Sequence, residues 1–324
     1  MNTRVVRCSV FAVVAVLAVT TAAFASPATG DQTRWALDFR VRLEQPSGPP
    51  VEIHLAGQWI STIAAVRPGD FDAQLQLDDV RFSGAGVGSV SAADVADLRR
   101  RLTRPFWATY RVDGGLVAVH FFRDVTAADQ NLLQMIATEM QLVRPASSSA
   151  SWTARERDGA GEYVALYVAP QPHRILKRKL KYLQTDGVSG APADAMRVGI
   201  DNSEITYAFT ADGLITAVDA VTRMRLALTP DANSQLAVVT QLHASNGHRR
   251  RAPELIGSLA RYGSRVIRSP IVTHTPDPAQ VRAQADDQLL NGWTTEALLA
   301  AAFAPEAPDG QLGDRLAALF RRRP

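Results

Sequence analysis

The sequence predicts an α+β protein in which a mostly antiparallel sheet is followed by a separate helical segment. Up to about residue 250, short runs alternate between apolar and polar residues and are separated by turn signals, a pattern typical of half-buried strands. From residue 251 onward, alanine and leucine dominate and the apolar residues take helical spacing. We therefore expect a sheet domain over residues 26–250 and a helical segment over residues 251–324.

The clearest strand lies directly after the start of the expected sheet domain. Its apolar residues share one parity and its charged residues share the other; the apolar set is Trp35, Leu37, Phe39, Val41 and Leu43. A proline-containing turn over residues 46–50 leads into Val51, Ile53 and Leu55. The two runs predict an antiparallel hairpin.

A second hairpin is predicted by a glycine-rich turn. Phe106–Arg111 and Leu116–Phe122 flank Asp113-Gly114-Gly115, a turn whose backbone requires positive φ. Similar alternation predicts further strands over residues 71–77, 80–82, 152–157, 162–169, 176–182, 204–209, 214–218, 223–228 and 235–243. Asp212-Gly213 and Asn246-Gly247 are interpreted as turns between them.

Two helices are predicted between the strands, and more follow the sheet. The first begins near Ser91, with Asp94 at capping-box spacing, and stops at Pro105. The second begins at an N-cap, Thr126, and carries an apolar stripe formed by Leu132, Leu133, Ile136, Met140 and Val143. After a proline-rich crossing, helices are predicted over residues 279–291, 295–303 and 312–322.

The N-terminus has the features of a signal peptide. Arg4 and Arg7 precede an uncharged run over residues 8–25, and this run ends in the small-x-small triplet Ala23-Phe24-Ala25. We expect residues 1–25 to be removed before Ser26, taking with them Cys8, the one cysteine of the chain. The mature protein is then periplasmic or secreted, has no disulfide or thiolate chemistry, and keeps no transmembrane segment.

Charge argues against a nucleic-acid partner. The formal net charge is only +3, and two of the positive charges lie in the expected signal peptide. Basic runs occur at Lys177–Lys181, His248–Arg251 and Arg321–Arg323. Each is interpreted as a solvated face.

No constellation typical of an enzyme is found, and neither a cofactor nor a metal is expected. No serine has the G-x-S-x-G context of a hydrolase nucleophile. The acidic residues Asp78, Asp79, Glu156 and Asp158 are interpreted as surface charges, because adjacent acids on a strand point to opposite faces. No two of the six histidines stand at metal-ligand spacing on a recognisable element.

Residues 72–184 resemble the N-terminal sheet domain of the large lipid-transfer proteins, the family of vitellogenin, apolipoprotein B and microsomal triglyceride transfer protein. The resemblance rests on a helix with an asparagine and paired leucines, and on a following strand. The residues that carry it are Leu77, Asp79, Val80, Pro105, Phe106, Gly114, Gly115, Asn131, Leu132, Leu133, Trp152, Glu156, Asp158, Gly161 and Tyr167.

The resemblance implies a β-barrel-like sheet around the second helix, and a function in binding or transporting lipid or another apolar ligand. A barrel would also remove the exposed strand edges that so many strands create. The candidate ligand-binding residues are large, inflexible aromatics, which can also serve as ordinary core; they are Trp59, Phe106, Trp107, Phe121 and Phe122.

A second function class is a protein-binding or scaffold module without lipid cargo. In that case the C-terminal helices form a cap, a docking surface for a protein partner, or the beginning of a helical array. An extracytoplasmic enzyme is kept in reserve. A lipid carrier would be marked by extractable lipid, and a protein-binding module by a basic or apolar surface strip. An enzyme would be marked by convergent titratable groups in a cleft.

Overall fold

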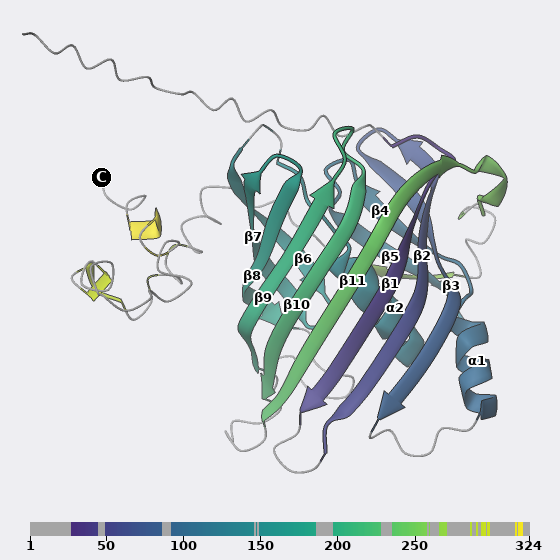
Figure 1. The fold of residues 1–324 in the computed structure, drawn as a ribbon, viewed down its shortest axis with the longest axis horizontal. Coiled ribbons are helices and arrows are strands. Elements are labelled where there is room, and N and C mark those ends of the chain that lie inside the picture. The colour runs from purple at the N-terminus through teal and green to yellow at the C-terminus, as the bar shows by residue number, and fades with distance from the viewer. Residues whose placement is uncertain are drawn as a thin grey trace, which may run out of the picture.

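The described residues form one 12-stranded sheet (Figure 1). This computed structural model describes residues 27–44, 49–85, 92–145, 147, 149–185, 197–227, 235–257, 259, 266–270, 286, 290, 293–295, 297–298, 315 and 317–319. The strands are β1 (Asp31–Glu44), β2 (Val51–Arg67), β3 (Asp70–Ala85), β4 (Phe106–Arg111), β5 (Leu116–Phe122), β6 (Ser151–Asp158), β7 (Gly161–Gln171), β8 (Arg174–Thr185), β9 (Arg197–Phe209), β10 (Ile215–Ala227), β11 (Gln235–Arg251) and β12 (Val266–Pro270).

The sheet is antiparallel and open. Its order is β12-β5-β4-β3-β2-β1-β11-β10-β9-β8-β7-β6, and β1 joins the two halves by pairing with both β2 and β11. The predicted antiparallel sheet is therefore confirmed. The closed barrel is not, because in the described part of the chain β6 and β12 are the two ends of the order and do not pair with each other.

The core lies on one face of this sheet. On β1, Trp35, Leu37, Phe39 and Val41 are all buried in the main apolar cluster, as their alternation predicts. The β1–β2 hairpin is also confirmed, with Leu43 opposite Val51. We call this side, which also contacts the helix described next, the inner face.

Helix α2 (Ala127–Glu139) covers part of the inner face. The side chain of Thr126 accepts a hydrogen bond from the Asp129 amide at 3.2 Å, so the predicted N-cap is confirmed. The helix contacts both β5 and β6, and in Figure 1 it lies behind the front strands of the curved sheet. A helix enclosed by a barrel is thus not confirmed; α2 instead packs against an open sheet.

Only part of the apolar stripe predicted for this helix lies within it. Leu133 and Ile136 are buried in the core, whereas the helix ends at Glu139 with Met140 as its C-cap, so Val143 lies beyond it. Helix α1 (Ala92–Leu102) packs beside β3 and buries Leu102. The predicted cap of α1, Ser91, lies outside the described residues.

Three predicted strand breaks are absent, and at two of them, Asp79 and Asn246-Gly247, the strand continues through an irregularity in its pairing. Asp79 takes a φ of 49° inside a continuous β3, and β10 runs unbroken from Ile215 to Ala227. Asn246-Gly247, predicted to be a turn, is an irregularity inside β11, where the pairing with β1 shifts register between Arg34 and Ala36. An extra residue in a strand reverses which face the following side chains occupy. Beyond this point the odd residues of β11 therefore face inward.

The outer face is partly covered by the chain that follows β11. After the short 3₁₀ helix η3 (Pro253–Leu255), the amide of Gly257 donates to Oε1 of Gln74 at 2.5 Å. Nε1 of Trp107 donates to the Gly257 carbonyl at 2.8 Å. These bonds tie residues 255–257 across the outer side of β3 and β4.

Other predicted segments can be compared only in part. Residues 1–26, which contain the expected signal peptide, lie outside the described residues. Strand β12 falls within the segment expected to be helical and pairs with β5, whereas Asp286 and Leu298 further on are helical. In the ranges that the structure describes, no helix has the length and apolarity needed to cross a membrane.

A buried carboxylate on the outer face gives a testable pH dependence. Asp72 accepts hydrogen bonds from Arg67 at 2.7 Å and from Thr109 at 2.8 Å. Burial alone would raise the pKa of Asp72, but these two donors lower it below its usual value. A lowered folded-state pKa gives stabilisation that is present above the unfolded pKa of about 4 and is lost as the pH falls through the folded value.

Asp72→Asn is therefore expected to lower the free energy of unfolding by about 1.5–3 kcal/mol at about pH 7, because it removes charged hydrogen bonds. The difference from the unaltered protein should shrink as the pH is lowered toward about 3. Urea denaturation at several pH values measures it. An equal difference at every pH would contradict this assignment.

Candidate ligand-binding site

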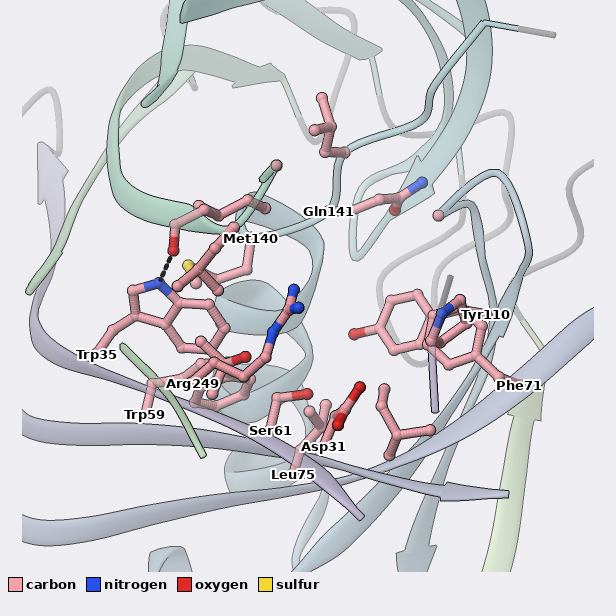
Figure 2. A pocket seen from close by; sticks show the side chains of 18 of the residues that line it. Asp31, Trp35, Trp59, Ser61, Phe71, Leu75, Tyr110, Met140, Gln141 and Arg249 are labelled. Carbon is pink, nitrogen blue, oxygen red and sulfur yellow. Dashed lines mark hydrogen bonds between the residues drawn. The ribbon is translucent and has the colours of Figure 1, made fainter. Parts of the chain in front are cut away.

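A cavity of about 210 Å³ lies on the inner face, at the end of the sheet where β1 begins. Its walls come from β1, β2 and β3, from the β4–β5 and β9–β10 turns, from β11, and from the segment that follows α2 (Figure 2). Since consecutive strand residues alternate between faces, Thr33, Trp35, Trp59 and Ser61 reach this cavity while their neighbours do not.

Aromatic side chains form the apolar wall. Trp59 and Leu75 line it and are buried, and Phe71 stacks on Tyr110 with ring centroids 5.4 Å apart. Burial raises the pKa of Tyr110 well above its usual value, so this phenol stays neutral. The wall therefore offers flat, uncharged rings to a ligand.

Trp35 is fixed in the wall by a hydrogen bond across two strands. Its Nε1 donates to the carbonyl of Ile215 at 2.9 Å. Gly247 passes so close that an added Cβ would stand 2.4 Å from the Ile215 oxygen and 2.6 Å from Nε1 of Trp35. A side chain at Gly247 would displace the indole, so the irregularity in β11 directly shapes the cavity.

Charged groups stand where the cavity opens to solvent. Arg249 is exposed, and its strand partner Thr33 also lines the cavity. The carboxylate of Asp31 is bonded to Arg251 at 2.7 Å. Burial lowers the pKa of Arg144, although Asp113 partly opposes this effect. Asp113 acts electrostatically on Arg144, and Asp212 lies within electrostatic reach of Arg249. Asp31 and Asp113 are in turn bonded to Arg251 and Arg111, so cations outnumber carboxylates around the opening.

The remaining wall is formed by Met140, Gln141, Leu142 and Arg144, in a segment that the sheet holds by its backbone. The Tyr207 hydroxyl donates to the Gln141 carbonyl at 2.5 Å, and Nε1 of Trp152 donates to the Val143 carbonyl at 2.9 Å. The Val143 amide donates in turn to the Tyr167 hydroxyl at 3.2 Å. The Met140 amide still donates to the Ile136 carbonyl at 3.0 Å as the helix cap, and beyond it side chains of three strands position the segment.

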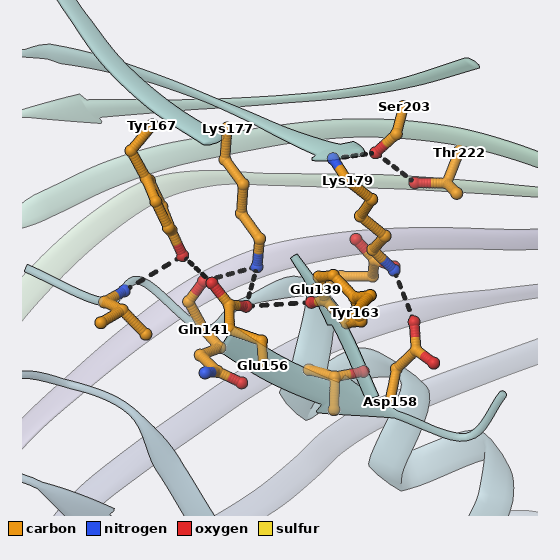
Figure 3. A network of polar contacts seen from close by, with 12 residues as sticks. Glu139, Gln141, Glu156, Asp158, Tyr163, Tyr167, Lys177, Lys179, Ser203 and Thr222 are labelled. Atoms are coloured by element: carbon orange, nitrogen blue, oxygen red, sulfur yellow. Dashed lines mark hydrogen bonds and ion pairs between the residues drawn. The ribbon is translucent and has the colours of Figure 1, made fainter. Parts of the chain in front are cut away.

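Beneath this segment lies a buried ionic network (Figure 3). Lys177 and Glu156, both fully buried, pair at 2.6 Å between Nζ and Oε2. The hydroxyl of Tyr163 donates to Glu156 at 2.9 Å, and that of Tyr167 also donates to this carboxylate. Nζ of Lys177 also reaches the Gln141 carbonyl at 3.3 Å. The network therefore connects β6, β7 and β8 to the cavity wall.

A second buried lysine anchors the end of α2. Nζ of Lys179 lies 2.6 Å from Glu139 and 2.9 Å from Asp158, and Tyr182 donates to Asp158 at 2.8 Å. Burial of Lys179 opposes its charge, but the two carboxylates outweigh it and raise the pKa of Lys179 well above its usual value. Lys179 is therefore a cation.

These contacts correct two interpretations drawn from the sequence. Glu156 and Asp158 were expected to be surface charges but are buried. Lys177 and Lys179 were expected on a solvated face, yet both point inward. The physical reason is that each finds opposite charges on other elements, which makes burial of the charge tolerable.

The five aromatics predicted to bind ligand fall into two groups. Trp59 lines the cavity, while Phe106 and Phe121 stack with centroids 5.1 Å apart in the core beside it. Trp107 and Phe122 pack edge to face at 5.6 Å, with Trp107 bonded to Gly257. Ligand binding by these five residues stays a prediction; within the cavity described here, only Trp59 is part of the wall.

Sequence reasoning missed most of the cavity. Trp35 could be assigned to the inner face from its parity alone. Arg249 could not, because the irregularity at Asn246-Gly247 changes the parity of the residues after it. Gln141 carries no local signal, since its position depends on bonds from distant strands.

Comparison with known proteins was informative at the level of structure. No family model matches the chain, and no curated protein matches it. A solved structure described as lipid–protein interactions in lipovitellin matches with a TM-score of 0.53 over 91% of this chain. The fold is similar to that of lipovitellin.

The likeness to lipovitellin supports the vitellogenin-like fold that the sequence resemblance implied. The two sequences are 11% identical, so the match shows the fold alone. The match also covers 33% of the lipovitellin chain, so this protein spans about a third of that molecule.

Proposed function

We propose that this chain is an exported lipid-binding or lipid-transport protein. The observation that carries the proposal is the lipovitellin-like fold, which extends over 91% of the chain. Lipovitellin is described in terms of its lipid–protein interactions. The sequence resemblance in residues 72–184 points to the same family of folds.

The inner face supplies the physical support. It contains a packed apolar core and, beside it, a cavity lined in part by aromatic rings, and apolar ligands bind in concave sites of this composition. Positive groups at the opening suit a ligand with a negatively charged end. Both features fit an amphipathic lipid better than a purely polar metabolite.

Export is the part of the proposal that rests on sequence. Arg4 and Arg7, the uncharged run over residues 8–25 and the triplet Ala23-Phe24-Ala25 are the support for a cleaved signal peptide. An exported protein with an apolar site could carry lipid across an aqueous compartment. Periplasmic or secreted localisation follows from this proposal.

A protein-binding module is the second candidate, and two observations favour it. The cavity of about 210 Å³ is smaller than the roughly 300–1,000 Å³ of typical ligand pockets. In the described part of the chain, β6 also pairs on one side only, with β7, which leaves an edge that an extended segment of a partner could join. This candidate requires no lipid cargo.

Lipid that co-purifies with the protein separates the two candidates. We expect native mass spectrometry of the protein from its own cells to show added mass that disappears on solvent extraction. The extract should contain acyl lipid at near-stoichiometric amount. A clean mass for the unliganded protein would contradict the lipid proposal and favour the protein-binding module.

A further inference from the structure

We propose that the inner-face cavity binds a single-chain anionic amphiphile, namely a fatty-acid-type carboxylate. Its hydrocarbon chain would lie between Trp35, Trp59 and Phe71, and its carboxylate would meet Arg249 (Figure 2) at the opening. Arg144 also lines the cavity and would be its second cationic partner. This inference rests on the proposed function and deepens it by naming the ligand class and the site.

Cavity size limits the ligand to one short apolar group. An apolar cavity of about 150 Å³ holds a benzene molecule, so about 210 Å³ accepts roughly six to eight carbon atoms. A sterol or a two-chain lipid cannot enter such a space completely. One acyl chain can enter it and bury roughly six to eight of its carbon atoms.

Charge selects the headgroup. Arg249 and Arg144 line the cavity together with one carboxylate, Asp31, and that carboxylate is already bonded to Arg251. A guanidinium group matches a carboxylate with two parallel hydrogen bonds. The opening therefore favours an anion over a neutral alcohol or a cationic amine.

A buried amide in the wall gives independent support. Gln141 is 2% exposed, and among the described residues neither its side-chain nitrogen nor its side-chain oxygen has a hydrogen-bond partner. Buried polar groups without partners are rare in folded proteins and call for a bound molecule or a functional role. A ligand carboxylate in the cavity would supply the acceptor that the Gln141 amide nitrogen lacks.

Calorimetric titration with a series of saturated carboxylates tests the size argument. From butanoate through hexanoate to octanoate, the affinity should rise about fourfold with each added methylene group, because each is buried. Beyond about eight carbons the gain should stop, since further methylene groups remain in water. No binding at any length, or a steady rise through dodecanoate, would overturn the proposal.

Two arginine variants on neighbouring positions test the charge argument. Arg249→Gln should weaken octanoate binding about threefold to fivefold, as expected for an exposed ion pair, and should leave octanol binding unchanged. Arg250→Gln is the matched control: it removes the same charge from the adjacent residue, whose side chain bonds Gln32 at 2.7 Å on the outer face. Equal weakening by both variants would overturn the site assignment.

A variant that fills the cavity tests where the hydrocarbon chain of the ligand lies. Ser61→Leu places a larger side chain in the cavity and should abolish octanoate binding while circular dichroism and the urea midpoint stay close to those of the unaltered protein. Retained binding in a folded Ser61→Leu protein would overturn the proposal.

Extractable lipid without octanoate binding would refute this site and leave the lipid function standing. Octanoate binding by a protein with a clean native mass would support the site and refute lipid transport.

Discussion

Replacing Lys177 with methionine is expected to lower the free energy of unfolding by about 3–5 kcal/mol. Methionine has nearly the same length but no charge, so the variant leaves the fully buried Glu156 carboxylate without its cation. The Gln141 carbonyl loses a donor at the same time. Urea denaturation of both proteins at neutral pH measures the difference.

An exposed ion pair provides the control. Arg40 and Asp38 are bonded at 3.1 Å, and their side chains are 48% and 40% exposed. Arg40→Met should therefore cost no more than about 1 kcal/mol. If Lys177→Met were as mild as Arg40→Met, the buried network would not be what holds the cavity wall to β8.

Replacing Phe106 with alanine is also expected to cost about 3–5 kcal/mol, because it leaves a cavity in a packed core. Phe106 is 2% exposed, stacks on Phe121, and meets Trp59 edge to face with centroids 5.9 Å apart. Thermal and urea denaturation measure the loss.

Phe122→Ala is the matched control for this second prediction. Phe122 is only partly buried and packs against Trp107 on the side of the strand opposite to Phe121. Its removal should cost clearly less than that of Phe106. Equal costs would mean that Phe106 is not held in the core, and its predicted role as a ligand-binding residue would regain support.

Local patterns in the sequence were enough to predict the elements that depend on neighbours along the chain. The alternation from Trp35 to Leu43 determines which face of β1 is buried, and Thr126 caps α2 through a bond to an amide three residues away. The turn at Gly114 likewise lies where its positive φ of 90° requires glycine.

Features that depend on distant partners were not predictable in this way. A run such as Lys177–Lys181 looks the same in sequence whether or not Glu156 and Glu139 stand opposite it on other elements. The irregularity at Asn246-Gly247 carries the signal of a turn, and only the pairing of β11 with β1 shows that the strand continues. The cavity combines both effects, which explains why only Trp59 among its residues was named as a ligand-binding candidate.

The open form of the sheet was not predictable for the same reason, because it also depends on distant partners. Strand count and edge protection favoured a closed barrel, but closure depends on whether the first and last strands of the order meet. In the described residues β6 and β12 do not pair with each other, and α2 packs against β5 and β6. Nothing in the local sequence of β6 distinguishes these two arrangements.

Native mass spectrometry of the protein isolated from its own cells, before and after solvent extraction, tests most directly whether this fold carries lipid. The predicted result is a bound species that extraction removes, with a single-chain acyl carboxylate in the extract at near-stoichiometric amount. A protein that shows only its own mass under conditions that preserve non-covalent complexes would contradict lipid binding by this chain.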